Sequence, residues 1–483
     1  MQALVSGRDF QTTIDAKEEP ETTDEESPAK YFDVIGFDPR GVNNTTPGFS
    51  CFPNLFAQKT WELQVQADGM LGSSESSLMR NWQRAQALNP SCSKSLATPP
   101  DGEDEALGHH MNTPPVARDM LEIIERHAEW REKQGQAQQA MHDRMHGYDA
   151  QQRIATRTRW NRGQEQLLYW GRSYGTVLGT TFATMFPNRV ARAVLDGVVD
   201  AEKYYTGHGP NPIVDADAIF DRFGEYCDVA GPDECPLYTQ GGSTAIKDAY
   251  LALDAAVRNA SIPVPASSTR GPEVITWTDL RTLLRFALYQ PLLAFPLLAQ
   301  YIGKLESGDG AAMVDFKQGN RSPSCLSEVC QQAGPWSTEC QDPRENENYA
   351  SSAILCSDAE YMGDIDEAGF QAYLDELKRD SQMLGDYWGH IRMPCVGWQA
   401  RAKWRLSGIY LFLLNLQVPL TDFVGPITAN TSHPLLFVSN TLDPVTPLRS
   451  AKKMSQSFPG SVVLEQDSEG VRLSIYTPFS ECH

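Results

Sequence analysis

The chain has 483 residues, a formal charge of −21 and an isoelectric point near 4.9. So acidic a surface disfavours nucleic acids and anionic membranes as partners. Hydrophobic residues make up 41% and charged residues 21%, as in a typical globular protein, but the length exceeds that of a usual single core. We therefore expect either one large domain with an insertion or two domains.

The sequence predicts alternating strands and helices in its first two hundred residues. An acidic exposed loop at 16–30 comes first. The elements that follow are a strand at 32–37, a helix at 114–147, a strand at 166–170, a helix at 176–186 and a strand at 190–195. Strand–helix–strand alternation is typical of a parallel sheet, so an α/β fold is expected.

The alternation stops near residue 200 and resumes near residue 430. The segment between is helical and irregular, and its most apolar stretch, 283–302, is interrupted by Arg285, Pro291 and Pro296, so no membrane span is expected. A strand at 434–439, a helix at 447–458 and a strand at 461–466 complete the pattern. The expected parts are a core with its nucleophile at 1–200, a helical cysteine-rich cap at 201–429, a second core part at 430–470 and an atypical tail at 471–483.

Ten cysteines favour disulfides, because no C-x-x-C pair or Cys/His metal-binding spacing accompanies them. We expect neither a metal nor a cofactor. The expected pairs are Cys227 with Cys235, and partners within the group Cys325, Cys330, Cys340 and Cys356.

Cysteine content also suggests secretion, and N-glycosylation sequons agree with it. They lie at Asn43, Asn44, Asn259, Asn320 and Asn430. The first residues nevertheless lack the basic start and the apolar core of a signal peptide. The composition thus favours secretion, whereas the N-terminal sequence does not.

The segment LLYWGRSYGTVLG, residues 167–179, contains a G-x-S-x-G pattern around Ser173. A predicted strand precedes it and a predicted helix follows, as in a nucleophile elbow, where Gly171 and Gly175 leave room for the strained turn. The backbone N–H of Tyr174 would then be one oxyanion donor. The alternative is a glycine-rich turn with an incidental serine, and the context favours the elbow.

Several segments together resemble a known family. YFDVIGFDPRGVNNTTP, YWGRSYGTVLG, FPNRVARAVLDGVVD, CVGW and HPLLFVSNTLDPVTPLRSAKKMSQSFPGSVVLEQDSEG are similar to the secreted tripeptidyl-aminopeptidase-like serine peptidases of the α/β-hydrolase fold (peptidase family S33), including their TAP-like C-terminal module. The resemblance implies proteolysis: release of short peptides from free N-termini through an acyl-enzyme. It also implies a helical cap inserted before the acid-bearing strand.

Within this resemblance Ser173 is the nucleophile and Asp443 the triad acid. The order Ser…Asp…His and the place of Asp443 after an apolar strand agree with that role. Asp443 can also be read as the N-cap of a helix with Pro444 at its first position, and both readings can hold.

The sequence departs from the family at the base. Where the family has Gly-His-Cys, Gly470 is followed by Val471, so the catalytic histidine is missing. Losing such a base costs on the order of a million-fold in kcat. His483 is a weak substitute. His433 precedes its strand at the wrong end, and His208 and His390 fall in the insertion.

A second departure is the absence of the Gly-Gly-Pro-Gly loop that supplies the other oxyanion N–H, which we expect to cost about 10²–10³ in rate. We therefore expect an N-terminally truncated α/β-hydrolase sheet from a truncated or mis-assembled gene product. The sheet should have a gap or a non-native pairing, and its exposed edges should favour aggregation.

The expected partner is a peptide substrate. Two other functions stay open: an esterase or prolyl aminopeptidase of the same fold, and a non-catalytic binding protein.

Overall fold

The computed structural model describes residues 2–17, 31–100, 102, 104–148, 153–207, 212–268, 270–319, 332, 346–360, 364–405 and 426–471. Its sheet has four parallel strands in the order β1-β2-β5-β6. They are β1 (Leu167–Arg172), β2 (Val190–Asp196), β5 (Leu436–Leu442) and β6 (Val462–Glu469). These strands confirm the strands predicted at 166–170, 190–195, 434–439 and 461–466. The strands and the helices between them also confirm the α/β class.

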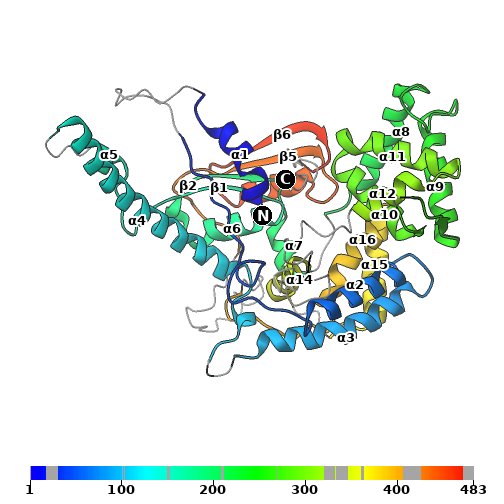
Figure 1. The fold of residues 1–483 in the computed structure, drawn as a ribbon, viewed down its shortest axis with the longest axis horizontal. Helices are drawn as coiled ribbons and strands as arrows, with labels where there is room; N and C mark the ends of the chain where they lie inside the picture. The colour runs from blue at the N-terminus through cyan, green and yellow to red at the C-terminus, as the bar shows by residue number, and fades with distance from the viewer. Residues whose placement is uncertain are drawn as a thin grey trace.

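Helices cover one face of this sheet (Figure 1). They are α4 (Thr113–His146), α6 (Tyr174–Met185) and α17 (Leu448–Gln456). Val116, Phe182, Phe437 and Met454 meet in the shared core, all at most 2% exposed. This core fixes the strand ends where the candidate site lies.

The other face of the sheet is only partly covered by the described residues. Leu168, Trp170, Val462 and Leu464 on this face are all exposed. Helix α1 (Gln2–Ile14) contacts this face through Phe10, whose ring centroid lies 5.1 Å from that of Trp170 and 4.4 Å from Arg172 Cζ. A parallel sheet is normally buried on both faces, so this surface is unusual for the class.

A group of helices beyond the sheet forms the larger part of the expected cap (Figure 1, green). Its helices share the core that contains Phe223, Tyr250 and Leu284. The elements are α8 (Ala216–Ala230), α9 (Gly242–Asn259), β3 (Ile262–Val264), β4 (Glu273–Ile275), α10 (Trp277–Tyr289), α11 (Pro291–Glu306) and α12 (Ala311–Gly319). Helix α7 (Ala201–Thr206) packs instead into the core of the sheet.

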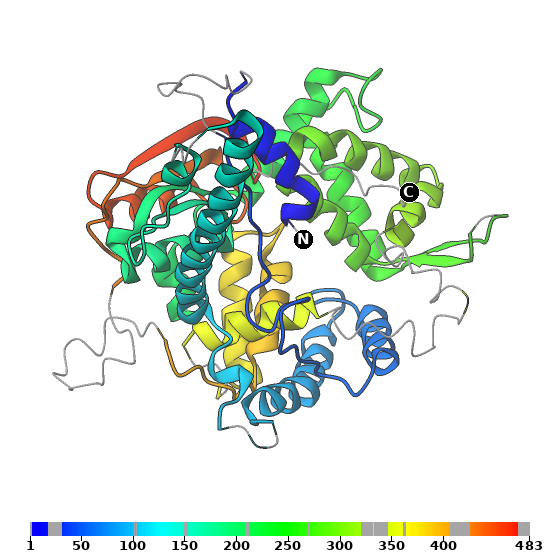
Figure 2. The ribbon, with the colours of Figure 1, turned by 60° about the vertical axis from the view of Figure 1, so that its left-hand side comes forward.

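A second helical group joins segments far apart in sequence, and Figure 2 shows its two parts, blue and yellow, side by side. Asn89 of the early part donates to the carbonyl oxygens of Met393 and Val396 at 3.2 and 2.8 Å. The boundary expected at residue 200 therefore does not separate the early helices from the cap. The elements of this group are α2 (Leu55–Asp68), α3 (Ser77–Ala97), α14 (Glu347–Asp358), α15 (Glu367–Asp380), α16 (Gly385–Arg392) and η4 (Met393–Cys395). Short helices elsewhere in the chain are η1 (Leu107–His109), α5 (Arg153–Arg157) and η2 (Pro187–Arg189).

The strand predicted at 32–37 is wrong. This segment is not hydrogen-bonded into the sheet, and Ile35 and Phe37 are exposed. Side chains of the α1 region satisfy its backbone instead: Phe32 N–H donates to Asp15 Oδ1 at 2.7 Å, and Gln11 Nε2 donates to the Phe32 carbonyl at 2.9 Å. Strand propensity alone does not create a strand without a partner edge. The four described strands are contiguous, so the expected gap or non-native pairing does not occur among them, although β1 and β6 are edges.

The disulfides agree in part with expectation. Cys227 pairs with Cys235 at a Cα separation of 5.4 Å, as predicted. The pairing of Cys356 within its own cluster is wrong, because Cys356 on α14 lies against η4 and pairs with Cys395. Cys325, Cys330 and Cys340 lie outside the described residues. Cys51 pairs with Cys92, a pair that spacing did not indicate.

None of the helices that the structure describes combines the length and apolar character that crossing a bilayer requires.

Candidate active site

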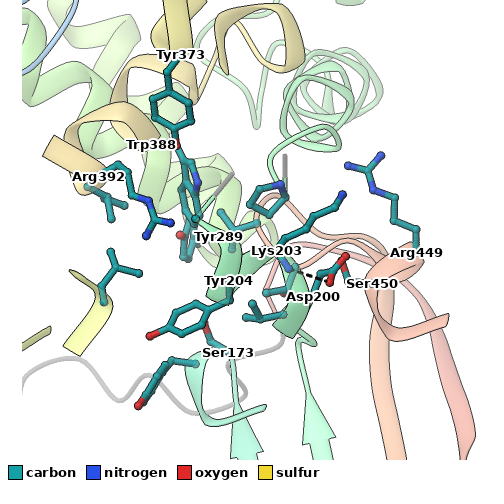
Figure 3. A pocket seen from close by; sticks show the side chains of 18 residues that line it. Ser173, Asp200, Lys203, Tyr204, Tyr289, Tyr373, Trp388, Arg392, Arg449 and Ser450 are labelled. Atoms are coloured by element: carbon teal, nitrogen blue, oxygen red, sulfur yellow. Dashed lines mark hydrogen bonds between the residues drawn. The ribbon is translucent and has the colours of Figure 1, made fainter. Parts of the chain in front are cut away.

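Ser173 lies on the sharp turn between β1 and α6, as predicted. Its φ of 50° and ψ of −119° put a non-glycine residue at positive φ, a strained conformation that is uncommon outside functional sites. The turn lifts the serine out of the end of the strand, and Figure 3 shows Ser173 at the floor of a cavity. This is the local geometry that a nucleophile elbow requires.

Glycines make the elbow sterically possible. A Cβ on Gly171 would overlap the carbonyl oxygen of Gly175, so no larger residue fits at position 171 without movement. Gly197, which follows β2 at φ 64°, lets Thr446 approach, since its Cβ would lie 3.2 Å from Thr446 Oγ1. Gly175 is less constrained by packing, and its carbonyl accepts a hydrogen bond from Tyr169 Oη at 2.7 Å.

Hydrogen bonds hold the strained turn in place. Ser173 N–H donates to the Asp196 carbonyl at 3.0 Å, and Thr176 Oγ1 donates to the Ser173 carbonyl at 2.7 Å. Val199 N–H donates to the same threonine oxygen at 3.0 Å. The ends of β1 and β2 are thereby tied to the first turn of α6.

Tyr174 is the first residue of α6, so its backbone N–H has no acceptor within the helix and can serve a ligand. Its side chain reaches a buried polar group: Tyr174 Oη lies 2.7 Å from Thr113 Oγ1, which lies 2.5 Å from Asp358 Oδ2. Tyr204 Oη donates to the same carboxylate at 3.0 Å. Burial raises the pKa of Asp358 to about 6, against the opposing effect of these hydrogen bonds.

Asp443 follows β5 at the same carboxyl edge of the sheet, and only 1% of it is exposed. Its Oδ1 accepts from the backbone N–H groups of Val445 at 3.0 Å and Thr446 at 2.7 Å. Burial is the main reason why the pKa of Asp443 is raised to about 6, and nearby Asp215 adds to it. Helix α17 begins only at Leu448, so Asp443 caps a turn rather than this helix with Pro444 at its first position.

Position 471 lies beside the acid-bearing strand. Gly470 N–H donates to the Leu442 carbonyl at 2.9 Å, which places Val471 close to Asp443 in space. Val471 N–H donates to the carbonyl of Tyr289, a residue that lines the cavity with Ser173. The fold therefore brings the residue that replaces the expected histidine to the edge where the candidate nucleophile and acid lie.

None of the described histidines can replace the expected general base, because none of them lines the cavity. His433 Nδ1 lies 3.0 Å from the Val190 carbonyl, at the opposite ends of the strands. The pKa of His390 is lowered by burial, and its Nδ1 has no hydrogen-bond partner. His208 and His483 lie outside the described residues.

The cavity measures about 260 Å³ and opens between the sheet edge and the helical groups. Figure 3 shows it enclosed by aromatic side chains, Tyr204, Tyr289, Tyr373 and Trp388. Three cations also line it: Lys203, Arg392 and Arg449. Among the described residues no cluster of histidine, cysteine or carboxylate side chains is arranged to hold a metal ion.

Sequence patterns located Ser173, Tyr174, Asp443 and Val471, which the structure brings to one edge of the sheet. They did not reveal the cavity cations or the buried Asp358 network. These residues come from α7, α14, α16 and α17, which are joined only by tertiary packing, so no local spacing marks them.

Asp358 gives the protein a measurable pH dependence of stability. Its pKa is about 6 when folded against an ordinary 3.8, so the folded state binds the proton more tightly. The resulting stabilisation is complete below pH 3.8 and is lost as the pH rises through 6, a difference of about 3 kcal/mol. Asp358→Asn should remove the part of the fall in urea-unfolding free energy between pH 4 and pH 7.5 that Asp358 causes, while the similar part due to Asp443 remains. The exposed control Asp233→Asn should leave the whole fall unchanged. Equal slopes in both variants would contradict the assignment.

Comparisons with known proteins agree with this geometry. Residues 381–482 match the family of TAP-like proteins, a match that begins well before the C-terminal core part expected at 430. The chain is 25% identical over 445 residues to the tripeptidyl aminopeptidase of Streptomyces lividans, covering 91% of the chain and 65% of that protein. The enzyme of Streptomyces coelicolor gives 25% over 445 residues, with 91% and 64% covered.

A third relative is the serine protease Hip1 of Mycobacterium tuberculosis, which is 25% identical over 314 residues, 62% of the chain and 51% of Hip1. The chain thus spans less than two thirds of the length of these curated relatives. The parallel sheet and the serine elbow agree with this similarity to TAP-like proteins and to serine peptidases.

Proposed function

We propose that the chain has the site of a serine hydrolase, and that its ancestral reaction is the release of short peptides from free N-termini. The observation that carries this proposal is the strained Ser173, held at positive φ between β1 and α6 at the floor of the cavity. We choose a short peptide as the substrate because the relatives are tripeptidyl aminopeptidases.

In the proposed reaction Ser173 Oγ attacks the scissile carbonyl carbon and forms a tetrahedral intermediate. The Tyr174 backbone N–H donates to the developing oxyanion. The serine proton passes to a base at position 471 and then to the leaving amine, which departs as the acyl-enzyme forms. Water repeats the sequence to release the peptide acid, while Asp443 orients the base.

We propose that this chain is impaired or inactive, because Val471 has no lone pair to accept the serine proton. None of the described histidines contributes to the raised pKa of Asp443, and a cation beside this carboxyl would lower that pKa. His483 is the weak substitute.

An esterase or prolyl aminopeptidase would use the same serine and acid. A non-catalytic binding protein would keep the cavity without needing the base, and the valine at 471 favours this third candidate over an ordinary active enzyme.

A substrate panel separates these functions. The panel comprises a fluorogenic tripeptide with a free N-terminus, its N-acetylated form, prolyl-aminomethylcoumarin and p-nitrophenyl butyrate. We expect weak turnover that is lost in Ser173→Ala, and a preference for the free tripeptide. Preference for the ester or for the prolyl substrate would support the second candidate. Peptide binding with no Ser173-dependent turnover, even after a histidine is introduced at 471, would support the third.

We also propose that the protein works outside the cytoplasm, in keeping with its disulfides. Three of the sequon asparagines, Asn44, Asn259 and Asn430, are exposed. After secretion from a eukaryotic host, treatment with a glycosidase should lower the mass if these sites carry glycans. An unchanged mass would remove glycosylation from this account.

A further inference from the structure

Arg392 places a cation without a carboxylate partner in the wall of the cavity. It ends α16 and is only 8% exposed, yet its guanidinium makes no hydrogen bond or ion pair within the described part of the chain. An unpaired buried charge is strongly unfavourable, so such a group is expected where a ligand supplies the missing partner. The arginine keeps its charge although burial lowers its pKa, because its ordinary value of 12.5 is so high.

The surroundings of Arg392 leave its fork accessible from the cavity. Figure 3 shows the guanidinium directed into the space between Trp388 and Tyr204. Gly207 caps α7 in the left-handed conformation and lies against the same group, since a Cβ there would be 2.8 Å from Arg392 Nη2. Among the described residues, Tyr373 and Tyr204 are the titratable groups that interact with Arg392.

The other charges of the cavity do not neutralise Arg392. Asp200 is the one carboxylate in the described lining, and Lys453 Nζ binds both of its oxygens at 3.0 Å. Lys203 also lies in the field of Asp200, and Arg449 in that of Asp215. Three cations and one carboxylate thus stand in the described lining of the cavity, although the whole protein is strongly acidic.

We propose that Arg392 anchors a subsite for a carboxylate group of the peptide that occupies the cavity. The proposal deepens the proposed function and rests on it for the location of the substrate. An arginine fork matches a carboxylate with two parallel hydrogen bonds, and the rings of Trp388 and Tyr373 would pack against the carbon chain that carries it. A free ammonium group would be repelled at this point. The carboxylate comes either from a glutamate or aspartate side chain or from the C-terminus of a short peptide.

Calorimetric binding to the Ser173→Ala protein tests this without any need for catalysis. Three peptides are compared: Ala-Ala-Glu-amide, Ala-Ala-Gln-amide and Ala-Ala-Gln with a free C-terminus. We expect at least one carboxylate peptide to bind roughly tenfold to hundredfold more tightly than the neutral amide. Tighter binding of the glutamate peptide assigns the side chain as the source, and tighter binding of the free acid assigns the C-terminus.

Variants make the assignment specific. Arg392→Gln should abolish the preference, Arg392→Lys should retain part of it, and Arg379→Gln, which removes an exposed charge from α15, should leave it unchanged. Arg392→Met should not lower the melting temperature, because it removes an unpaired buried charge. Equal affinity for all three peptides, or a preference that survives Arg392→Gln, would overturn the proposal. A serine that fails to react would overturn only the proposed hydrolysis.

Discussion

Val471→His is expected to raise the hydrolysis rate of the chain by at least about 10³-fold. The full effect of a missing base is on the order of 10⁶ in kcat, so an introduced histidine that is only partly oriented should still recover about 10³ of it. The backbone is already placed for this change. Gly470 N–H donates a hydrogen bond to the Leu442 carbonyl, and Asn440 Nδ2 donates to the Gly470 carbonyl at 2.6 Å.

The gain should depend on the complete triad. Val471→Gln adds a polar side chain that cannot act as a base, so it should not raise kcat/KM. Asp443→Asn combined with Val471→His should lose most of the gain, because the imidazole is no longer oriented or stabilised as a cation. The kcat/KM of the histidine variant should fall on the acid side as the introduced imidazole, whose ordinary pKa is about 6.5, becomes protonated. No gain from the histidine in a correctly folded protein would contradict the assignment of position 471.

Removing the disulfide between Cys356 and Cys395 is expected to lower the free energy of unfolding by about 4 kcal/mol, as estimated from the chain entropy of the loop. The two cysteines are 39 residues apart, and both are 3% exposed in a shared core. This core supports η4 and the end of α16, where Arg392 lies. Urea unfolding of the double serine variant measures the loss, and binding of carboxylate peptides should weaken with it.

The disulfide between Cys227 and Cys235 is the matched control. Its loop is only 8 residues long, so its double serine variant should lose about 2.5 kcal/mol. It lies in the helical core that contains Phe223, Tyr250 and Leu284, whereas η4 belongs to a different core. Its removal should therefore leave peptide affinity unchanged. A larger loss from the short loop than from the long one would show that packing, not loop closure, dominates.

Local sequence patterns predicted the paired parts of the fold well. The strands β1, β2, β5 and β6 are apolar runs bounded by turn residues, and each finds a partner in the sheet. The same reasoning failed at 32–37, because a strand depends on its partner as much as on its own residues. It also failed for Cys356, whose partner is fixed by the packing of α14 on η4.

The candidate site was predictable only where its residues carry a motif. Ser173 and Gly171 form a pattern whose chemistry depends on local backbone geometry, and Asp443 follows a recognisable strand. Arg392 and Asp358 carry no such pattern. Their properties come from burial, which is a consequence of the whole fold.

Mass-spectrometric mapping of fluorophosphonate labelling tests the central claim most directly. An elbow keeps part of its reactivity without a base, because the oxyanion donor and the exposed nucleophile still act. The account predicts slow labelling of the native chain at Ser173, faster than at any other serine and lost after denaturation in urea. Labelling of Ser173 that is equal in the native and denatured chains, or that occurs mainly at another serine, would contradict the account.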